Sequence, residues 1–106
     1  MAYLIEKEKR VFGESEFVEI KIYEVENSRL FPEGIKYSMV FVKNGICLLR
    51  YDNERNKGHH KHISGKESGI EFKGVEQLKK SFYEEVNALR RDLYESSQRH
   101  NQNRQL

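Results

Sequence analysis

The chain has 106 residues, of which 34% are charged and 37% hydrophobic, and its formal net charge is only +2. This length supports one domain with a modest core and excludes two. The small net charge excludes a uniformly basic nucleic-acid coat, so any attraction to phosphate has to be local.

The amino-terminal part predicts β-strands. Residues 3–12 are compatible with a strand, and residues 17–25, FVEIKIYEV, alternate apolar and charged side chains as a strand with one buried face does. Residues 35–42, IKYSMVFV, are apolar at consecutive positions, which indicates a strand covered on both faces.

Asn44-Gly45 predicts a tight hairpin turn, because both residue types tolerate positive φ. The partner strand is expected over residues 46–51, and a weaker one over residues 69–73. Cys47 is the only cysteine, so an internal disulfide is excluded, and its apolar neighbours predict a small buried side chain. We therefore expect an antiparallel meander of four to five strands.

After Gly74 the apolar period lengthens to three and four residues, as on one face of a helix. The stripe consists of Val75, Leu78, Phe82, Val86, Leu89 and Leu93. We expect this long helix to cover the sheet, because a small sheet needs an apolar cover. The predicted fold is thus α+β, with one domain over residues 1–95 and a polar tail, 96–106, that frays. Neither a signal peptide nor a membrane-length span is recognisable, so we expect a cytoplasmic protein.

The segment 50–67, RYDNERNKGHHKHISGKE, is predicted to be a loop that follows the hairpin strand. Each lysine alone would be explained by solubility, but the cluster of positive charges favours binding of an anion such as phosphate. The candidate substrate-binding residues are Arg50, Tyr51, Asn53, Lys57, Lys61 and Lys66.

His59, His60 and His62 suit general acid–base catalysis, because an imidazole titrates near pH ~6.5 and can accept or donate a proton. RNA cleavage without metal needs a base for the 2′-hydroxyl, an acid for the departing 5′-oxygen and a cation for the phosphoryl oxygens. Asp52 would orient one of the histidines or simply form a turn, and we weigh these two roles equally. Tyr37 is expected to serve sheet packing.

Two other functions are compatible with the same residues. A non-catalytic module could dock on nucleic acid or an acidic partner through its positive charges. A metal-dependent hydrolase could bind its ion through His60 and His62, with Asp52 or Glu67 as a further ligand. The neighbouring lysines, 57 and 61, weigh against a metal because they raise the positive potential there. We therefore expect neither a metal nor another cofactor.

The sequence from Ile35 to Phe82 resembles the TumE-type toxin family of prokaryotic toxin–antitoxin systems. The resemblance rests on Lys36-Tyr37-Ser38, Tyr51-Asp52-Asn53, Gly58-His59-His60-Lys61-His62 and Glu71-Phe72. It implies a type II toxin that inhibits growth and is neutralised by a helix-turn-helix antitoxin encoded beside it. The loop chemistry, and the frequency with which such toxins attack RNA, make endoribonuclease activity the favoured hypothesis. Exposed strand edges and the long helix are also compatible with a homodimer.

Overall fold

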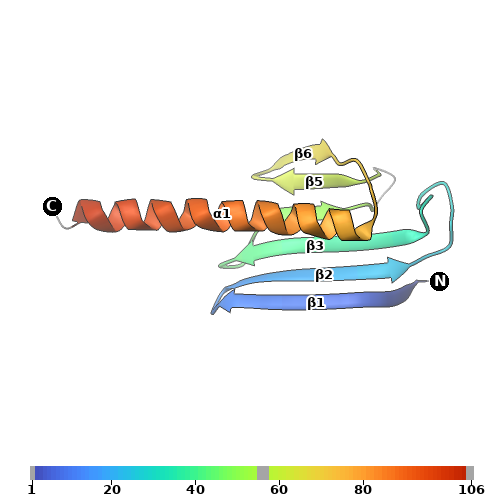
Figure 1. Ribbon diagram of the computed structural model, residues 1–106, viewed down its shortest axis with the longest axis horizontal. Helices are drawn as coiled ribbons and strands as arrows, with labels where there is room; N and C mark the ends of the chain where they lie inside the picture. Colours follow the sequence, from blue (N-terminus) through green and yellow to red (C-terminus); the bar gives the residue numbers. More distant parts are fainter. Residues whose placement is uncertain (1, 55–57, 105–106) are drawn as a thin grey trace. The chain divides into compact units, whose positions relative to one another are not determined.

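The computed structural model describes residues 2–54 and 58–104, with side chains as far as residue 97. The elements are β1 (Tyr3–Gly13), β2 (Glu16–Glu24), β3 (Ile35–Lys43), β4 (Ile46–Asp52), β5 (His60–Ile63), β6 (Lys66–Gly69) and α1 (Val75–Arg104). The strands form one sheet in sequence order, and every neighbouring pair is antiparallel (Figure 1). The α+β class, the meander and the long helix are confirmed, and the described residues contain six strands instead of four to five.

The sheet has an apolar face and a polar face, because successive side chains of a strand point to opposite sides. The apolar face carries the buried residues Val18, Ile20, Ile22, Tyr37, Met39, Phe41, Leu49 and Tyr51. These residues lie opposite one another across the strands, as in the row Ile20, Met39 and Tyr51. The polar face carries the residues in between, including the row Lys21, Ser38, Asp52 and His60.

Residues 60–67, which were predicted to belong to a loop, instead belong to a β-hairpin formed by β5 and β6. Ser64 and Gly65 turn the chain between β5 and β6 with φ of 50° and 78°. Asn44 and Gly45 do the same between β3 and β4, with φ of 53° and 77°. Two consecutive positive φ values match the twist of a tight hairpin. The strand expected over residues 69–73 was misplaced, because β6 ends at Gly69.

Cys47 is exposed, contrary to the prediction that it is buried. It lies near the turn at the start of β4, before the buried part of that strand, which begins at Leu49. The apolar run around Cys47 therefore marks a strand end and not a core position.

The chain divides into two compact units, residues 1–72 with the sheet and residues 73–106 with the helix. Within α1, the middle of the predicted stripe, Leu78, Phe82 and Val86, is buried. The helical backbone continues through residue 104. Within the described residues, α1 is too polar for its length to cross a membrane.

The first strand, β1, is an edge of the sheet and carries charged side chains on both faces. Glu6 and Glu8 pair with Ile22 and Ile20 and so lie on the apolar face, whereas alternation places Lys7 and Lys9 on the polar face. Arg10 pairs with Val18 and so shares the apolar face with Glu8, to which its Nε–H donates at 2.9 Å. The edge therefore presents lysines on one side, and two glutamates with an arginine on the other.

Candidate functional site

Four side chains from three strands meet on the polar face, and we call them the His60–His62 cluster. Asp52 of β4 lies opposite His60 of β5, and Glu67 of β6 lies opposite His62 of β5. His60 and His62 share a face because they are two residues apart on one strand. The hairpin thus brings two imidazoles and two carboxylates together.

The ring of His60 is held at both nitrogens. Its Nε2 lies 2.7 Å from Oδ1 of Asp52, and its Nδ1 lies 2.9 Å from the carbonyl oxygen of Gly58. A carbonyl and an ionised carboxylate can only accept hydrogen bonds, so both contacts are satisfied together by a ring that carries a proton on each nitrogen. The side chains of His60 and Asp52 are only 7% and 12% exposed, which shields this ion pair from water.

His62 stands beside this ion pair at a more accessible position. Its ring centroid is 5.2 Å from that of His60, and the planes are inclined by 73°. Oε1 of Glu67 lies 3.8 Å from Nε2 of His60. Arg50, which is exposed, lies opposite His62 on β4 and adds a cation to the same face.

A hollow of about 400 Å³ lies on the polar face, one strand away from Asp52. Ser38 lines it and is the neighbour of Asp52 across β3 and β4. Lys21 and Lys36 also line it, and each pairs with a glutamate, at 3.6 Å and 3.4 Å respectively. The hollow therefore lies in line with the cluster and contains two lysines.

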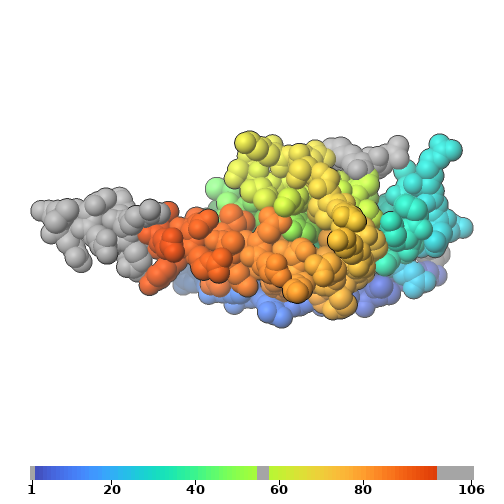
Figure 2. Space-filling view, turned by 45° about the horizontal axis from the view of Figure 1, so that its top comes forward, coloured from blue at the N-terminus to red at the C-terminus, as the bar shows by residue number. Residues whose placement is uncertain are grey.

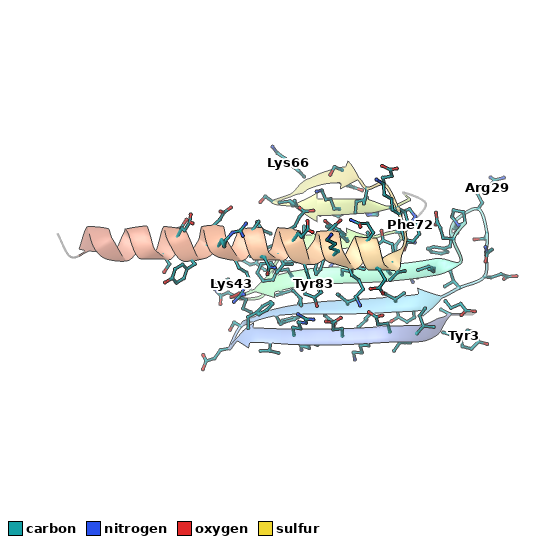
Figure 3. The ribbon with its side chains drawn as sticks, viewed as in Figure 1. Tyr3, Arg29, Lys43, Lys66, Phe72 and Tyr83 are labelled. Atoms are coloured by element: carbon teal, nitrogen blue, oxygen red, sulfur yellow. The ribbon has the colours of Figure 1, made fainter. Side chains whose placement is uncertain are left out.

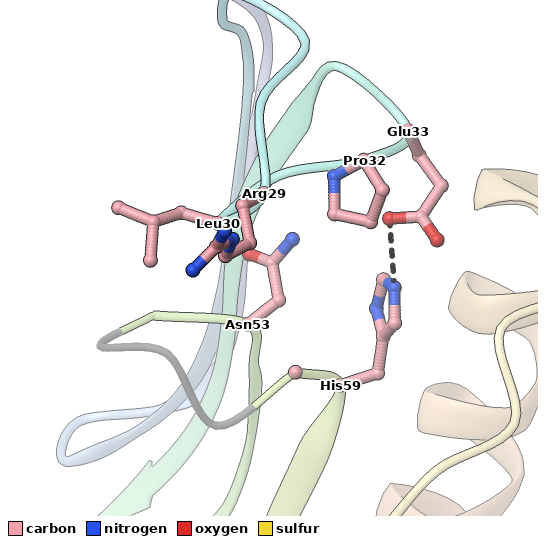
Figure 4. Close-up of a pocket in the computed structure, with 7 residues that line it drawn as sticks. Arg29, Leu30, Pro32, Glu33, Asn53 and His59 are labelled. Carbon is pink, nitrogen blue, oxygen red and sulfur yellow. Dashed lines mark hydrogen bonds and ion pairs between the residues drawn. The ribbon is translucent and has the colours of Figure 1, made fainter.

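His59 belongs to a separate network on the side of the apolar face. Its Nδ1 is 3.0 Å from the hydroxyl of Tyr37, and its Nε2 is 3.0 Å from Oε1 of Glu33 (Figure 4). Its ring also stacks on Phe72, with centroids 4.4 Å apart and an angle of 11° between the planes. His59 thus ties the segment between β2 and β3, shown in cyan in Figure 2, to the start of β5.

The phenol of Tyr37 is a hydrogen-bond donor available to His59. Burial, together with the carboxylates of Asp52 and Glu33, raises the pKa of Tyr37 well above its ordinary value of 10.0. The phenol therefore stays protonated and is able to donate to Nδ1 of His59. Nε2–H of His59 can then donate to Glu33.

The raised pKa of Tyr37 predicts a loss of stability at alkaline pH. The contribution of Tyr37 to the free energy of unfolding should be fully present below about pH 10 and should fall as the pH rises above that value, because the unfolded chain then ionises first. Thermal unfolding at about pH 9 and about pH 11 should show a smaller alkaline loss in Tyr37→Phe than in the original chain. Tyr94→Phe is the control, since Tyr94 is 65% exposed. An equal alkaline loss in Tyr37→Phe would contradict this role.

Asn53 joins two strand ends below a pocket of about 130 Å³, which it lines with His59 and Glu33. Its Oδ1 accepts a bond of 3.0 Å from the backbone N–H of Tyr37, and its Nδ2 donates one of 2.8 Å to the carbonyl of Ile35. Asn53 is 3% exposed. Its side chain therefore completes backbone hydrogen bonding at the start of β3.

The structure brings together some of the residues singled out in the sequence and separates others. Asp52, His60, His62 and Arg50 lie on the polar face, whereas His59 lies on the other side. Two further candidate residues, Tyr51 of β4 and Lys61 of β5, lie on the apolar face because side chains alternate along a strand. Lys66 begins β6 and points away from the sheet (Figure 3). Lys57 lies outside the described residues.

Ser38, Lys21 and Glu33 were not identified as site residues from the sequence. The signal for Ser38 is the period of two in β3, which places it on the face opposite Tyr37 and Met39. Its alignment with Lys21 and Asp52 follows only from the register of three strands. Glu33 reaches His59 across 26 positions of sequence, and no local pattern indicates such a contact.

Comparison with known proteins identifies the family. The model of the family described as Toxin TumE matches residues 2–90, which include the whole sheet and the first half of α1. No curated protein and no solved structure shows significant similarity to this chain. The family match extends the resemblance seen in residues 35–82 to the amino-terminal strands. The chain therefore belongs to the TumE toxin family.

Proposed function

We propose that this toxin cleaves RNA strands without a metal ion, through acid–base chemistry at the His60–His62 cluster. The observation that best supports the proposal is the ring of His60, held by Asp52 at 2.7 Å, with the ring of His62 beside it at 5.2 Å. A cleavage reaction of this kind needs one protonated and one unprotonated ring near a single phosphate.

The two histidines take different roles in this reaction. His62 accepts the proton of the ribose 2′-hydroxyl, and the 2′-oxygen attacks the adjacent phosphorus. His60 donates its Nε2 proton to the 5′-oxygen as the bond from phosphorus to that oxygen breaks. The products are a 2′,3′-cyclic phosphate and a 5′-hydroxyl. The proton that His62 takes from the 2′-hydroxyl is matched by the one that His60 gives to the 5′-oxygen. Asp52 orients His60 and stabilises its charged form before the transfer.

The cations of the polar face would hold the substrate. Arg50 lies next to His62 and would stabilise negative charge on the phosphoryl oxygens of the transition state. The hollow with Lys21 and Lys36 continues from the cluster along Ser38 and would take the neighbouring phosphates of the strand. Lysine pairs with phosphate as a point charge, which suits contact with the backbone of RNA irrespective of base.

The family implies a toxin–antitoxin context and therefore a cognate antitoxin. We further propose a helix-turn-helix antitoxin as the partner and the cytoplasm, where RNA is available, as the place of action. Growth arrest on expression of the chain alone, relieved by the antitoxin, follows from this assignment.

The products of cleavage test the proposed reaction. Protein treated with a chelator should cut single-stranded RNA and leave 2′,3′-cyclic phosphate ends, identified by mass spectrometry. A substrate with one 2′-deoxyribose should resist cleavage at that position, because the attacking hydroxyl is missing there. Uncut RNA, or products with 5′-phosphate ends, would contradict the proposal.

A further inference from the structure

The His60–His62 cluster also has the composition and spacing of a metal site. One ring nitrogen of His60, one of His62 and one carboxylate oxygen of Glu67 lie within 4.8 Å of one another. Ligand atoms bound to Zn²⁺ at about 2.0–2.2 Å lie roughly 3–3.5 Å from each other in a tetrahedral site. Small rotations of the exposed Glu67 and the half-buried His62 would bring the ligand atoms from their present separation to the one that a tetrahedral site requires.

His60 already has the orientation that a metal ligand needs. Its Nδ1–H donates to the carbonyl of Gly58 at 2.9 Å, which directs Nε2 towards Asp52 and Glu67. Histidines that bind metals through one nitrogen typically donate the other N–H to a carbonyl or carboxylate in this way. The proton between Nε2 and Asp52 occupies the position that a cation would take, so Asp52 is available as a fourth ligand.

The local charge also favours a cation. The cluster contains two carboxylates, so with neutral rings its charge would be −2 before an ion binds. Lys61 does not oppose binding as its place in the sequence suggested, because it lies opposite Tyr51 on the apolar face. Arg50 does lie on the same face, but it is exposed and its charge is screened by water.

We propose that His60, His62 and Glu67, with Asp52 beside them, bind a divalent transition-metal ion of the Zn²⁺ class. Two imidazole nitrogens with carboxylate oxygen are a ligand set that suits such ions. The ion and a proton compete for the same ring nitrogens, so a bound ion removes both histidines from proton transfer. The metal therefore inhibits RNA cleavage. The binding site is argued from geometry alone, whereas this inhibition rests on the proposed function.

Calorimetric titration of chelator-stripped protein with Zn²⁺ tests the binding site. We expect one ion per chain and a loss of affinity of at least about 10-fold in both His62→Ala and Glu67→Gln, the loss seen even for outer ligand partners. Glu67→Gln is nearly isosteric at an exposed position, so its fold should be intact by circular dichroism. Glu95→Gln on α1 is the matched control and should bind Zn²⁺ normally. Absence of binding, or an affinity in both site variants equal to that of the original chain, would overturn the site.

A cleavage assay with added Zn²⁺ tests the inhibition. Half of the activity should be lost near the Zn²⁺ concentration that half-saturates the chain in calorimetry, and Glu67→Gln should need correspondingly more. Stimulation by Zn²⁺ would overturn the inhibitory role. Variant-sensitive Zn²⁺ binding by a protein that never cleaves RNA would support the site and refute the proposed function. Cleavage in the presence of a chelator by a protein that never binds Zn²⁺ would support the proposed function and refute the metal site.

Discussion

Replacement of His62 by alanine should lower the rate of RNA cleavage by about 10²- to 10⁴-fold, the usual contribution of one general acid or base. His62 is the more accessible ring of the cluster and its proposed base. His60 cannot replace it, because both of its ring nitrogens are engaged, by Asp52 and by the carbonyl of Gly58. The measurement is single-turnover cleavage of a labelled RNA by purified protein. Expression of His62→Ala should then no longer arrest growth.

A second substitution at the same position separates catalysis from simple binding. His62→Lys retains a positive charge, so RNA affinity should persist while cleavage is lost. A non-catalytic binding module would instead keep its full biological effect with lysine. Lys66→Ala is the control, because Lys66 lies at the hairpin turn away from the cluster, and it should cleave RNA normally (Figure 3). Wild-type cleavage by folded His62→Ala would remove this residue from the mechanism.

Replacement of Asn53 by alanine should lower the free energy of unfolding by about 2–4 kcal/mol. The substitution leaves the N–H of Tyr37 and the carbonyl of Ile35 without their partner, and each buried backbone group in that state costs about 1–3 kcal/mol. Urea unfolding followed by circular dichroism gives the difference directly.

Ser28→Ala provides the comparison for Asn53→Ala. The hydroxyl of Ser28 accepts one hydrogen bond from the N–H of Phe31, at 3.2 Å in an exposed segment. Water can replace that bond, so the loss should stay below about 1 kcal/mol. Unchanged stability with impaired cleavage in Asn53→Ala would instead make Asn53 a substrate-binding residue, as the sequence first suggested.

The sequence predicted those parts of the fold in which apolar residues repeat with a clear period. The alternation in residues 17–25 corresponds to β2, and Asn44-Gly45 forms the expected turn, because both features act locally. The stripe from Val75 onward marks α1 for the same reason.

The β5–β6 hairpin could not be recognised by the same rules. Its strands, HKHI and KESG, contain one large apolar residue between them, so they lack the alternation that identifies a strand. They pair because β4 offers a free edge beside them and because Ser64-Gly65 adopts the turn. Because the sequence does not show this pairing, it suggested a loop. The directions of the three histidine rings therefore could not be predicted.

The sequence indicated which residue types form the candidate site, but it did not indicate how they are arranged. Asp52, His60 and His62 were identified because few structural roles require such a cluster. The separation of His59 depends on Glu33 and Phe72, which contact it from distant positions in the chain. Contacts of this kind depend on how strands pair, and strand pairing cannot be predicted from any short segment of the sequence.

The arrangement of charges along β1 has a consequence for self-association. If two copies extended their sheets into one by antiparallel pairing of β1, side chains facing each other would come from the same face of the sheet. With the strand centres aligned, Glu8 would oppose Glu8 of the second copy and Lys7 would oppose Lys9, whereas Glu6 would oppose Arg10. The repulsion between the like charges offsets the one attractive contact, so β1 is a poor template for fibre-like growth in this register.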